Sequence, residues 1–222
     1  MLKRILALLI LFTCVFSILP ASGLLATQVQ GAESPPDILL YEKYPNSKEF
    51  QISTAEGLQK FSELGQSTNF SGKTFYMICD IDMSGYSYTP PVNFAGVFDG
   101  GFHAVKALSV TTSDLNCGFV GKVTSTGVIR NLGVEGGIFT ATCSKDSWRA
   151  GTLAGIVEKG LVENCWSSSS VTISGGYEYL SVGGIVGGMT DSAKVSGCIN
   201  YGSVEGVSKG GSICGIAVGT TT

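Results

Sequence analysis

Two carboxylates that stand two residues apart could act together in binding or catalysis. Asp80 and Asp82 alternate with the apolar residues Cys79, Ile81 and Met83, so an extended strand would direct both carboxylates to its polar face. A rise of about 3.3 Å per residue would place them roughly 7 Å apart, which suits calcium binding or acid–base chemistry on a glycan. Neither kind of site is complete in the sequence. We therefore expect a structural role, assign no catalytic residue, and keep Asp80 and Asp82 only as weak metal candidates.

Other residues that could carry chemistry are few. The only histidine is His103, and the sequence holds no Cys-x-x-Cys pair. Six cysteines follow the N-terminal apolar segment, which in a secreted chain would suggest a disulfide framework. However, Cys165 and Cys198 continue, at one constant interval, a series that begins with Leu132, so we expect buried free thiols instead. The sequence thus predicts no cofactor and no enzyme activity.

A 33-residue repeat in the second half of the chain must position these side chains. Three series of apolar residues keep this interval: Ile129, Val162 and Val195; Leu132, Cys165 and Cys198; and Ile138, Val171 and Val204. An earlier copy, Val105 and Leu108, precedes the first at a shorter interval. Repeats of this length signal a solenoid, in which each unit buries its apolar face against its neighbours. We predict an all-β, parallel β-helix-like solenoid with coils about 4.8 Å apart.

The N-terminus has the layout of a secretory signal peptide. Lys3 and Arg4 precede an apolar run from Ile5 to Leu19, and small residues follow. The run is shorter than the roughly 20 residues that a membrane span needs, although an uncleaved anchor is the alternative. We predict cleavage within residues 21–32 and a secreted or cell-surface location.

The chain divides into four predicted parts: a signal peptide (1–32), a leader or linker (33–49), an N-terminal cap with a short helix (50–68) and the β-helical repeat domain (69–222). In the cap, Ser53 and Glu56 have the spacing of a capping box, and Phe61 belongs to the apolar face of the helix. The last Gly-rich segment begins near Gly215, so we expect the repeat domain to be incomplete at Thr222. An exposed strand edge there would favour self-association or a missing downstream domain.

The charge pattern excludes one class of partner. The net charge is −3, charged residues make up 14% of the chain, and no cluster of Lys and Arg follows the signal segment. We therefore expect no nucleic-acid partner. The 31 glycines suit short strands with tight corners.

Five motifs occur in an order that resembles a known group: 52–58 (ISTAEGL), 80–83 (DIDM), 96–100 (GVFDG), the repeated Gly-Ile-Val segments, and Asn164-Cys165. Over residues 50–219 the chain resembles bacterial surface proteins with GLUG repeats. Similar repeats occur in the non-catalytic N-terminal regions of some IgA-cleaving metalloproteases. The resemblance implies a β-helical fold, secretion or wall attachment, and Asp-x-Asp as a structural element. Two departures are Phe102, where the family has Gly, and Gly197, which replaces the Asn before Cys198.

Together these observations predict a non-catalytic structural or adhesion module whose surface ligand is a protein or a glycan. One alternative is a carbohydrate-active β-helix enzyme, a lyase or hydrolase, which would need a cluster of acidic and basic side chains on one outer face. Another is the non-catalytic N-terminal part of a larger secreted protease. Four tyrosines could stack on a sugar, although we expect them to cover the first coil: Tyr41, Tyr44, Tyr86 and Tyr88.

Overall fold

The computed structural model describes residues 34–124, 126–142, 148–174, 180–190, 192–205 and 209–218. The chain separates into two compact units, and the unit described here runs from Pro35 to Thr222. The predicted signal peptide, residues 1–32, lies outside the described residues, as do Cys143 and residues 219–222. In the described ranges, no helix is both long and apolar enough to cross a membrane.

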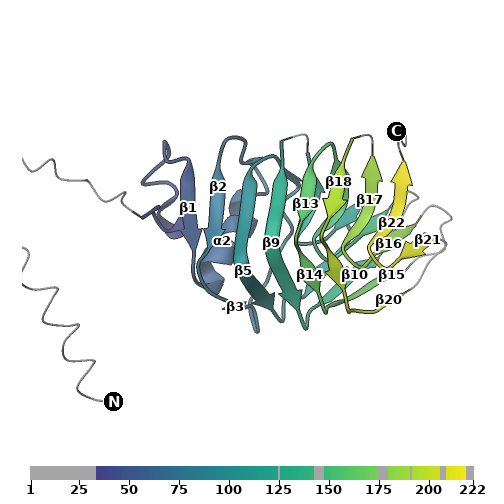
Figure 1. Ribbon diagram of the computed structural model, residues 1–222. Coiled ribbons are helices and arrows are strands. Elements are labelled where there is room, and N and C mark those ends of the chain that lie inside the picture. The colour runs from purple at the N-terminus through teal and green to yellow at the C-terminus, as the bar shows by residue number, and fades with distance from the viewer. Residues whose placement is uncertain are drawn as a thin grey trace, which may run out of the picture. The chain divides into compact units, whose positions relative to one another are not determined.

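The described unit is a parallel β-solenoid, which confirms the predicted fold (Figure 1). Successive circuits of the chain add strands to the same four sheets, and the paired strands run parallel. We number the sheets one to four in the order in which the circuits that begin at β5, β9, β13 and β18 visit them.

The strands of each sheet come from successive circuits. The first sheet contains β1 (Glu49–Ile52), β2 (Thr74–Met77), β3 (Ile81–Asp82), β5 (Val97–Lys106), β9 (Val128–Glu135), β13 (Leu161–Glu163), β14 (Trp166–Ser167), β18 (Lys194–Ser196) and β19 (Ile199–Asn200). The second contains β6 (Val110–Thr112), β10 (Ile138–Thr142), β15 (Ser170–Ser174) and β20 (Val204–Glu205). The third contains β7 (Asn116–Cys117), β11 (Arg149–Ala150), β16 (Ser181–Gly183) and β21 (Lys209–Gly211). The fourth contains β4 (Asn93–Phe94), β8 (Val120–Val123), β12 (Ala154–Glu158), β17 (Val186–Thr190) and β22 (Cys214–Val218).

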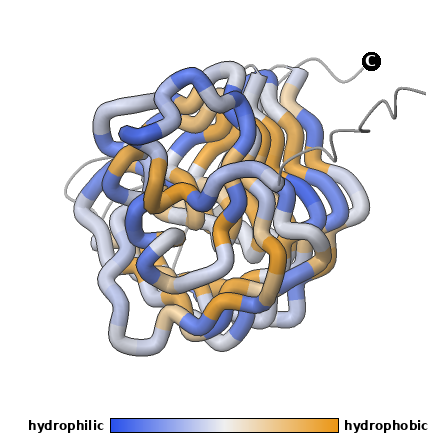
Figure 2. Tube along the Cα trace, turned by 90° about the vertical axis from the view of Figure 1, so that its left-hand side faces the viewer, coloured by the Kyte–Doolittle hydropathy of each residue, from blue (hydrophilic) through white to orange (hydrophobic). Residues whose placement is uncertain are grey.

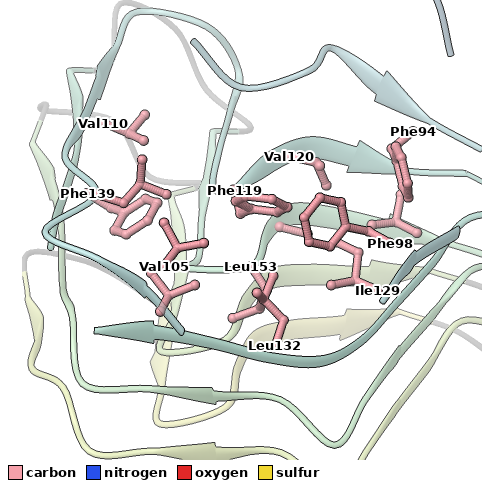
Figure 3. Close-up of a cluster of buried hydrophobic side chains, with 14 of the residues drawn as sticks. Phe94, Phe98, Val105, Val110, Phe119, Val120, Ile129, Leu132, Phe139 and Leu153 are labelled. Carbon is pink, nitrogen blue, oxygen red and sulfur yellow. The ribbon is translucent and has the colours of Figure 1, made fainter. Parts of the chain in front are cut away.

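Apolar side chains from all four sheets fill the inside of the solenoid. The first sheet contributes Phe98, Ile129 and Leu132, whose side chains point toward Phe119 and Leu153 at the corners between the third and fourth sheets (Figure 3). All five side chains are fully buried. Seen along the solenoid, apolar segments of successive circuits lie behind one another (Figure 2). Each circuit therefore buries its apolar face against its neighbours.

The register of the first sheet confirms the central column of the repeat. Val162 pairs with Ile129 on one side and with Val195 on the other. The Val162 side chain is fully buried between these neighbours. The predicted stack is thus the one that the chain forms.

The predicted earlier copy of the repeat is wrong. Phe98, and not Val105, pairs with Ile129, and Val105 pairs further along β9. The reason is an irregularity in β5 between Asp99 and His103, where the ladder to β9 shifts register. Over this stretch β5 has two more residues than β9, which changes the spacing along the chain without changing which side chains enter the core.

A second predicted column is wrong by one residue. Phe139, and not Ile138, pairs with Val171 in the second sheet. Phe139 is fully buried, whereas Ile138 is 57% exposed. A shift of one residue along a strand moves a side chain from the core to the outer face, so spacing alone could not distinguish the two.

The Gly-rich segments form corners between the third and fourth sheets. At Gly118 an added Cβ would lie 2.8 Å from the Ala154 Cα, and at Gly151 it would lie 2.6 Å from the Val186 Cα. Real Cβ atoms do not approach a backbone atom this closely. Glycine is therefore needed wherever the corner of one circuit presses on the backbone of the next.

The short helix predicted near the N-terminus is α2 (Ala55–Leu64). Its N-cap is Thr54, whose hydroxyl accepts a hydrogen bond from the Gly57 N–H at 3.1 Å. The predicted capping box at Ser53 and Glu56 does not form, because Ser53 donates to Asp37 and the Glu56 carboxylate accepts from Tyr86 instead. Threonine serves as an N-cap as serine does, so the helix start shifts by one residue.

The segment predicted as a leader or linker, residues 33–49, contributes to the core. It contains the 3-10 helix η1 (Ile38–Leu40), and the Ile38 side chain is fully buried. The ring of Tyr41 packs against Phe50 with the ring centroids 4.9 Å apart. The first coil is therefore covered in part by residues that precede β1.

Candidate functional site

The predicted carboxylate pair is committed to structural contacts. Asp80 accepts hydrogen bonds from the Ala104 N–H at 2.9 Å and from the Lys106 Nζ at 2.7 Å. Asp82 accepts a hydrogen bond from the Ser84 N–H at 2.8 Å. The Lys106 hydrogen bond is the main reason that the pKa of Asp80 lies below its usual range, and the bond from Ser84 does the same for Asp82. Asp80 thus ties the start of β3 to β5, and Asp82 holds the turn that follows β3. Among the described residues, no group of three or more His, Cys, Asp or Glu side chains could hold a metal ion.

A column of left-handed residues marks a bend in four successive circuits of the first sheet. The pairing of β5, β9, β14 and β19 places four positive-φ residues at equivalent positions: Phe102 (62°), Asn131 (53°), Asn164 (52°) and Gly197 (62°). Asn and Gly adopt this conformation readily, which explains why Gly197 can replace an Asn. Phe102 adopts the same conformation at a cost in strain, because a residue with a bulky side chain is rarely found with positive φ. A strained aromatic residue therefore stands on the surface, 68% exposed.

Trp166 lies flat over the neighbouring coil. It pairs with Gly133 of β9, and a Cβ added at Gly133 would lie 2.3 Å from the Cε2 atom of the indole. The indole Nε1–H donates a hydrogen bond to the Glu135 Oε1 at 3.0 Å. Gly133 thus provides the space for the ring, and Glu135 fixes its orientation.

Trp166 and Glu135 belong to the lining of an open groove of about 660 Å³ on the outer face of the first sheet. Its lining residues are Phe102, Glu135, Asn164, Cys165, Trp166, Ser168, Gly197, Ile199 and Tyr201. Ile199 is 50% exposed and Tyr201 is 72% exposed. The groove crosses coils, because its aromatic residues come from different circuits. Open, partly apolar grooves with a few polar groups are typical of ligand sites.

The groove was not predicted from the sequence, although a signal for it exists. The inward position of Cys165 implies that Trp166 points outward, and Gly133 stands one full repeat before Trp166. A tryptophan beside a glycine on the next rung indicates a ring that lies on the surface of the sheet. Of the tyrosines suggested as a sugar-stacking surface, Tyr88 is buried and donates a hydrogen bond to the Phe119 carbonyl at 2.9 Å.

Two thiols stack beneath the groove. Cys79, Cys165 and Cys198 are free, with Cys165 buried and the other two half-buried. A hydrogen bond from the Cys165 thiol lowers the pKa of Cys198 to about 7. The same contact, followed by burial, raises the pKa of Cys165 well above its usual value. The lower pKa and the greater exposure of Cys198 both favour reaction at Cys198, although the repeat places the two thiols at equivalent positions.

We expect Cys198 to be alkylated by iodoacetamide before Cys165, with a rate that rises as the pH passes through about 7. A lowered pKa means that the reactive thiolate is present above this pH and is lost below it. Peptide mapping by mass spectrometry measures the rate at each cysteine. In Cys165→Ala the hydrogen-bond donor is gone, so the midpoint for Cys198 should move to higher pH. Faster labelling of Cys165, or an unchanged midpoint in the variant, would contradict the assignment.

No protein-family model matches the chain. No curated protein sequence matches it either. Among solved structures, the fold is similar to that of a Bacteroides ovatus protein described as a "putative immunoglobulin A1 protease". The TM-score is 0.53 and the sequence identity is 19%, over 78% of this chain and 65% of that chain. The likeness shows a shared fold, and this chain spans less than two thirds of that protein's length.

Proposed function

We propose that the chain is a non-catalytic binding module of a secreted or cell-surface protein, and that the groove at Trp166 holds its ligand. The observation that carries the proposal is the set of exposed aromatic rings gathered on one sheet face, where Phe102 is strained and Tyr201 is 72% exposed. Residues held in a rare conformation on the surface are often functional. The resemblance to GLUG-repeat surface proteins supports the same function.

The fold also supports a place within a larger protein. The Bacteroides ovatus protein that shares the fold is longer, and its description names a protease. We propose, as a second candidate, that this chain is the non-catalytic N-terminal part of such a protease. Catalysis would then reside outside the repeats, and the groove would hold or orient the target.

The third candidate, a carbohydrate-active enzyme, has weaker support. Glycoside hydrolysis commonly uses two carboxyl groups that flank the scissile bond. Among the described residues that line the groove, Glu135 is the one carboxylate, and its Oε1 already accepts the Trp166 indole N–H. Asp80 is bound to Lys106 and Ala104.

Binding of the purified chain to an array of extracellular proteins and glycans tests the proposed function. We expect a ligand whose affinity falls at least tenfold in Tyr201→Ala, because an exposed ring contributes contact area that alanine lacks. The matched control is Tyr44→Ala, since Tyr44 is also exposed, at 40%, but lies outside the groove.

Two results would contradict the proposal. One is binding that Tyr201→Ala leaves unchanged. The other is turnover of a polysaccharide that Asp80→Asn or Asp82→Asn abolishes, which would favour the enzyme.

A further inference from the structure

We propose that the groove binds a neutral glycan chain that lies across the coils, with its sugar rings against Trp166 and Tyr201. This inference rests on the proposed function and names the class of ligand. Three features of the groove carry it: the paired backbone beneath Trp166, the aromatic faces and the lack of cations among its described lining residues.

The backbone beneath the Trp166 ring is engaged in the strand ladder on both sides. β9 pairs with β5 on one side and with β13 and β14 on the other, and β14 pairs onward with β19. A peptide that binds by strand addition needs an open sheet edge, which among the described strands on this side of the first sheet lies at β18 and β19 and not beneath Trp166. At Trp166 the ligand is therefore recognised by side chains.

The side chains of the groove combine flat apolar surfaces with hydrogen-bonding groups. The Trp166 ring rests on Gly133, and its edge is tied to Glu135 at 3.0 Å, so the ring is held in place before a ligand arrives. Glu135 is half-buried, and its second carboxylate oxygen can accept a hydrogen bond from a hydroxyl. The Ser168 hydroxyl stands beside it on the next rung. A sugar offers both partners, an apolar face of C–H groups for the ring and hydroxyls for the polar groups.

The charge of the groove favours a neutral ligand. Its described lining residues include no Lys or Arg, and the nearby Lys106 ammonium is bound to Asp80 at 2.7 Å. Phosphate or sulfate groups would meet the Glu135 carboxylate without a cation to balance them. An anionic glycan or a nucleic acid is therefore disfavoured.

The arrangement of the rings favours a chain over a single sugar. Phe102 belongs to the circuit of β5, Trp166 to that of β14, and Tyr201 follows β19. Circuits are about 4.8 Å apart, so the exposed rings extend over more than one sugar unit along the solenoid. The groove is open, which suits a polymer that passes through it.

Screening the purified chain on an array of neutral and anionic glycans, followed by calorimetry with the best neutral oligosaccharide, tests the inference. We expect binding to a neutral class, with an affinity that increases from the disaccharide to the tetrasaccharide. Trp166→Ala should weaken binding at least tenfold, whereas Trp166→Phe should retain most of it. The Trp166 fluorescence should change on binding, because the other tryptophan, Trp148, is only 1% exposed.

A second variant displaces the Trp166 ring without removing it. Gly133→Ala places a Cβ in the space of the indole and should weaken binding with Trp166 still present. Circular dichroism establishes that each variant is folded, and Tyr44→Ala again serves as the control with unchanged affinity.

The outcomes separate the two levels of the proposal. If only proteins or only anionic glycans bind, and Tyr201→Ala weakens that binding, the glycan inference is overturned and the binding module stands. If a neutral glycan binds but Trp166→Ala and Gly133→Ala have no effect, the groove is not its site and the inference fails. If nothing binds, both fail.

Discussion

Phe61→Ala is expected to destabilise the solenoid by about 3–5 kcal/mol, the usual cost of truncating a buried phenylalanine. Phe61 of α2 is fully buried. Its ring centroid lies 5.0–5.9 Å from five other rings: Phe70, Phe75, Phe94, Phe98 and Phe119. Alanine would leave a cavity in the middle of this cluster, and the surrounding strands are fixed by their ladders, so they can close the cavity only in part.

Urea denaturation followed by circular dichroism measures the change in the free energy of unfolding. The matched control is Glu63→Ala on the same helix, where the side chain is exposed and alanine is a better helix former. That variant should unfold within about 0.5 kcal/mol of the parent chain. If Phe61→Ala behaved like Glu63→Ala, α2 would not be part of the solenoid core.

The fold could be predicted because the repeat records which residues face inward. The column of Ile129, Val162 and Val195 follows directly from their constant interval in the sequence, and the structure places these residues on neighbouring rungs. Where the chain adds or loses a residue, the interval no longer identifies the register. The irregularity in β5 makes Phe98 the partner of Ile129.

The candidate site was harder to predict because it depends on the outer face. Outward positions are not constrained by the stack, so their residue types do not repeat. Phe102 and Tyr201 stand three repeat lengths apart, yet the register shift in β5 places them in different columns. The spacing of Asp80 and Asp82 made them the weak metal candidates, whereas in the structure Asp80 forms an ion pair with Lys106 and accepts a hydrogen bond from the Ala104 N–H. The interval between Gly133 and Trp166 indicates where the ring lies, but only the folded chain shows that Glu135 fixes the ring and that Tyr201 lines the same groove.

Val162→Asp is expected to destabilise the chain by about 4 kcal/mol or more, and to leave little folded protein at 37 °C. Val162 is fully buried, and its neighbours in the ladder are the apolar residues Ile129 and Val195. A carboxylate at this position would have no cation and no hydrogen-bond donor from the flanking side chains. It would either remain charged in an apolar stack or take up a proton at a cost in free energy.

Because each circuit is stabilised only by its neighbours, a defect at Val162 weakens the contacts with both adjacent circuits. Thermal denaturation followed by circular dichroism should show the midpoint of Val162→Asp far below that of the parent chain. The matched control is Lys194→Asp, which introduces the same side chain at an exposed position of the next strand, β18. That control should change the stability by no more than about 0.5 kcal/mol. A Val162→Asp variant that melts within a degree of the parent would mean that Val162 faces solvent. The register of the first sheet would then be wrong by one residue, because only such a shift exchanges the inner and outer faces of a strand.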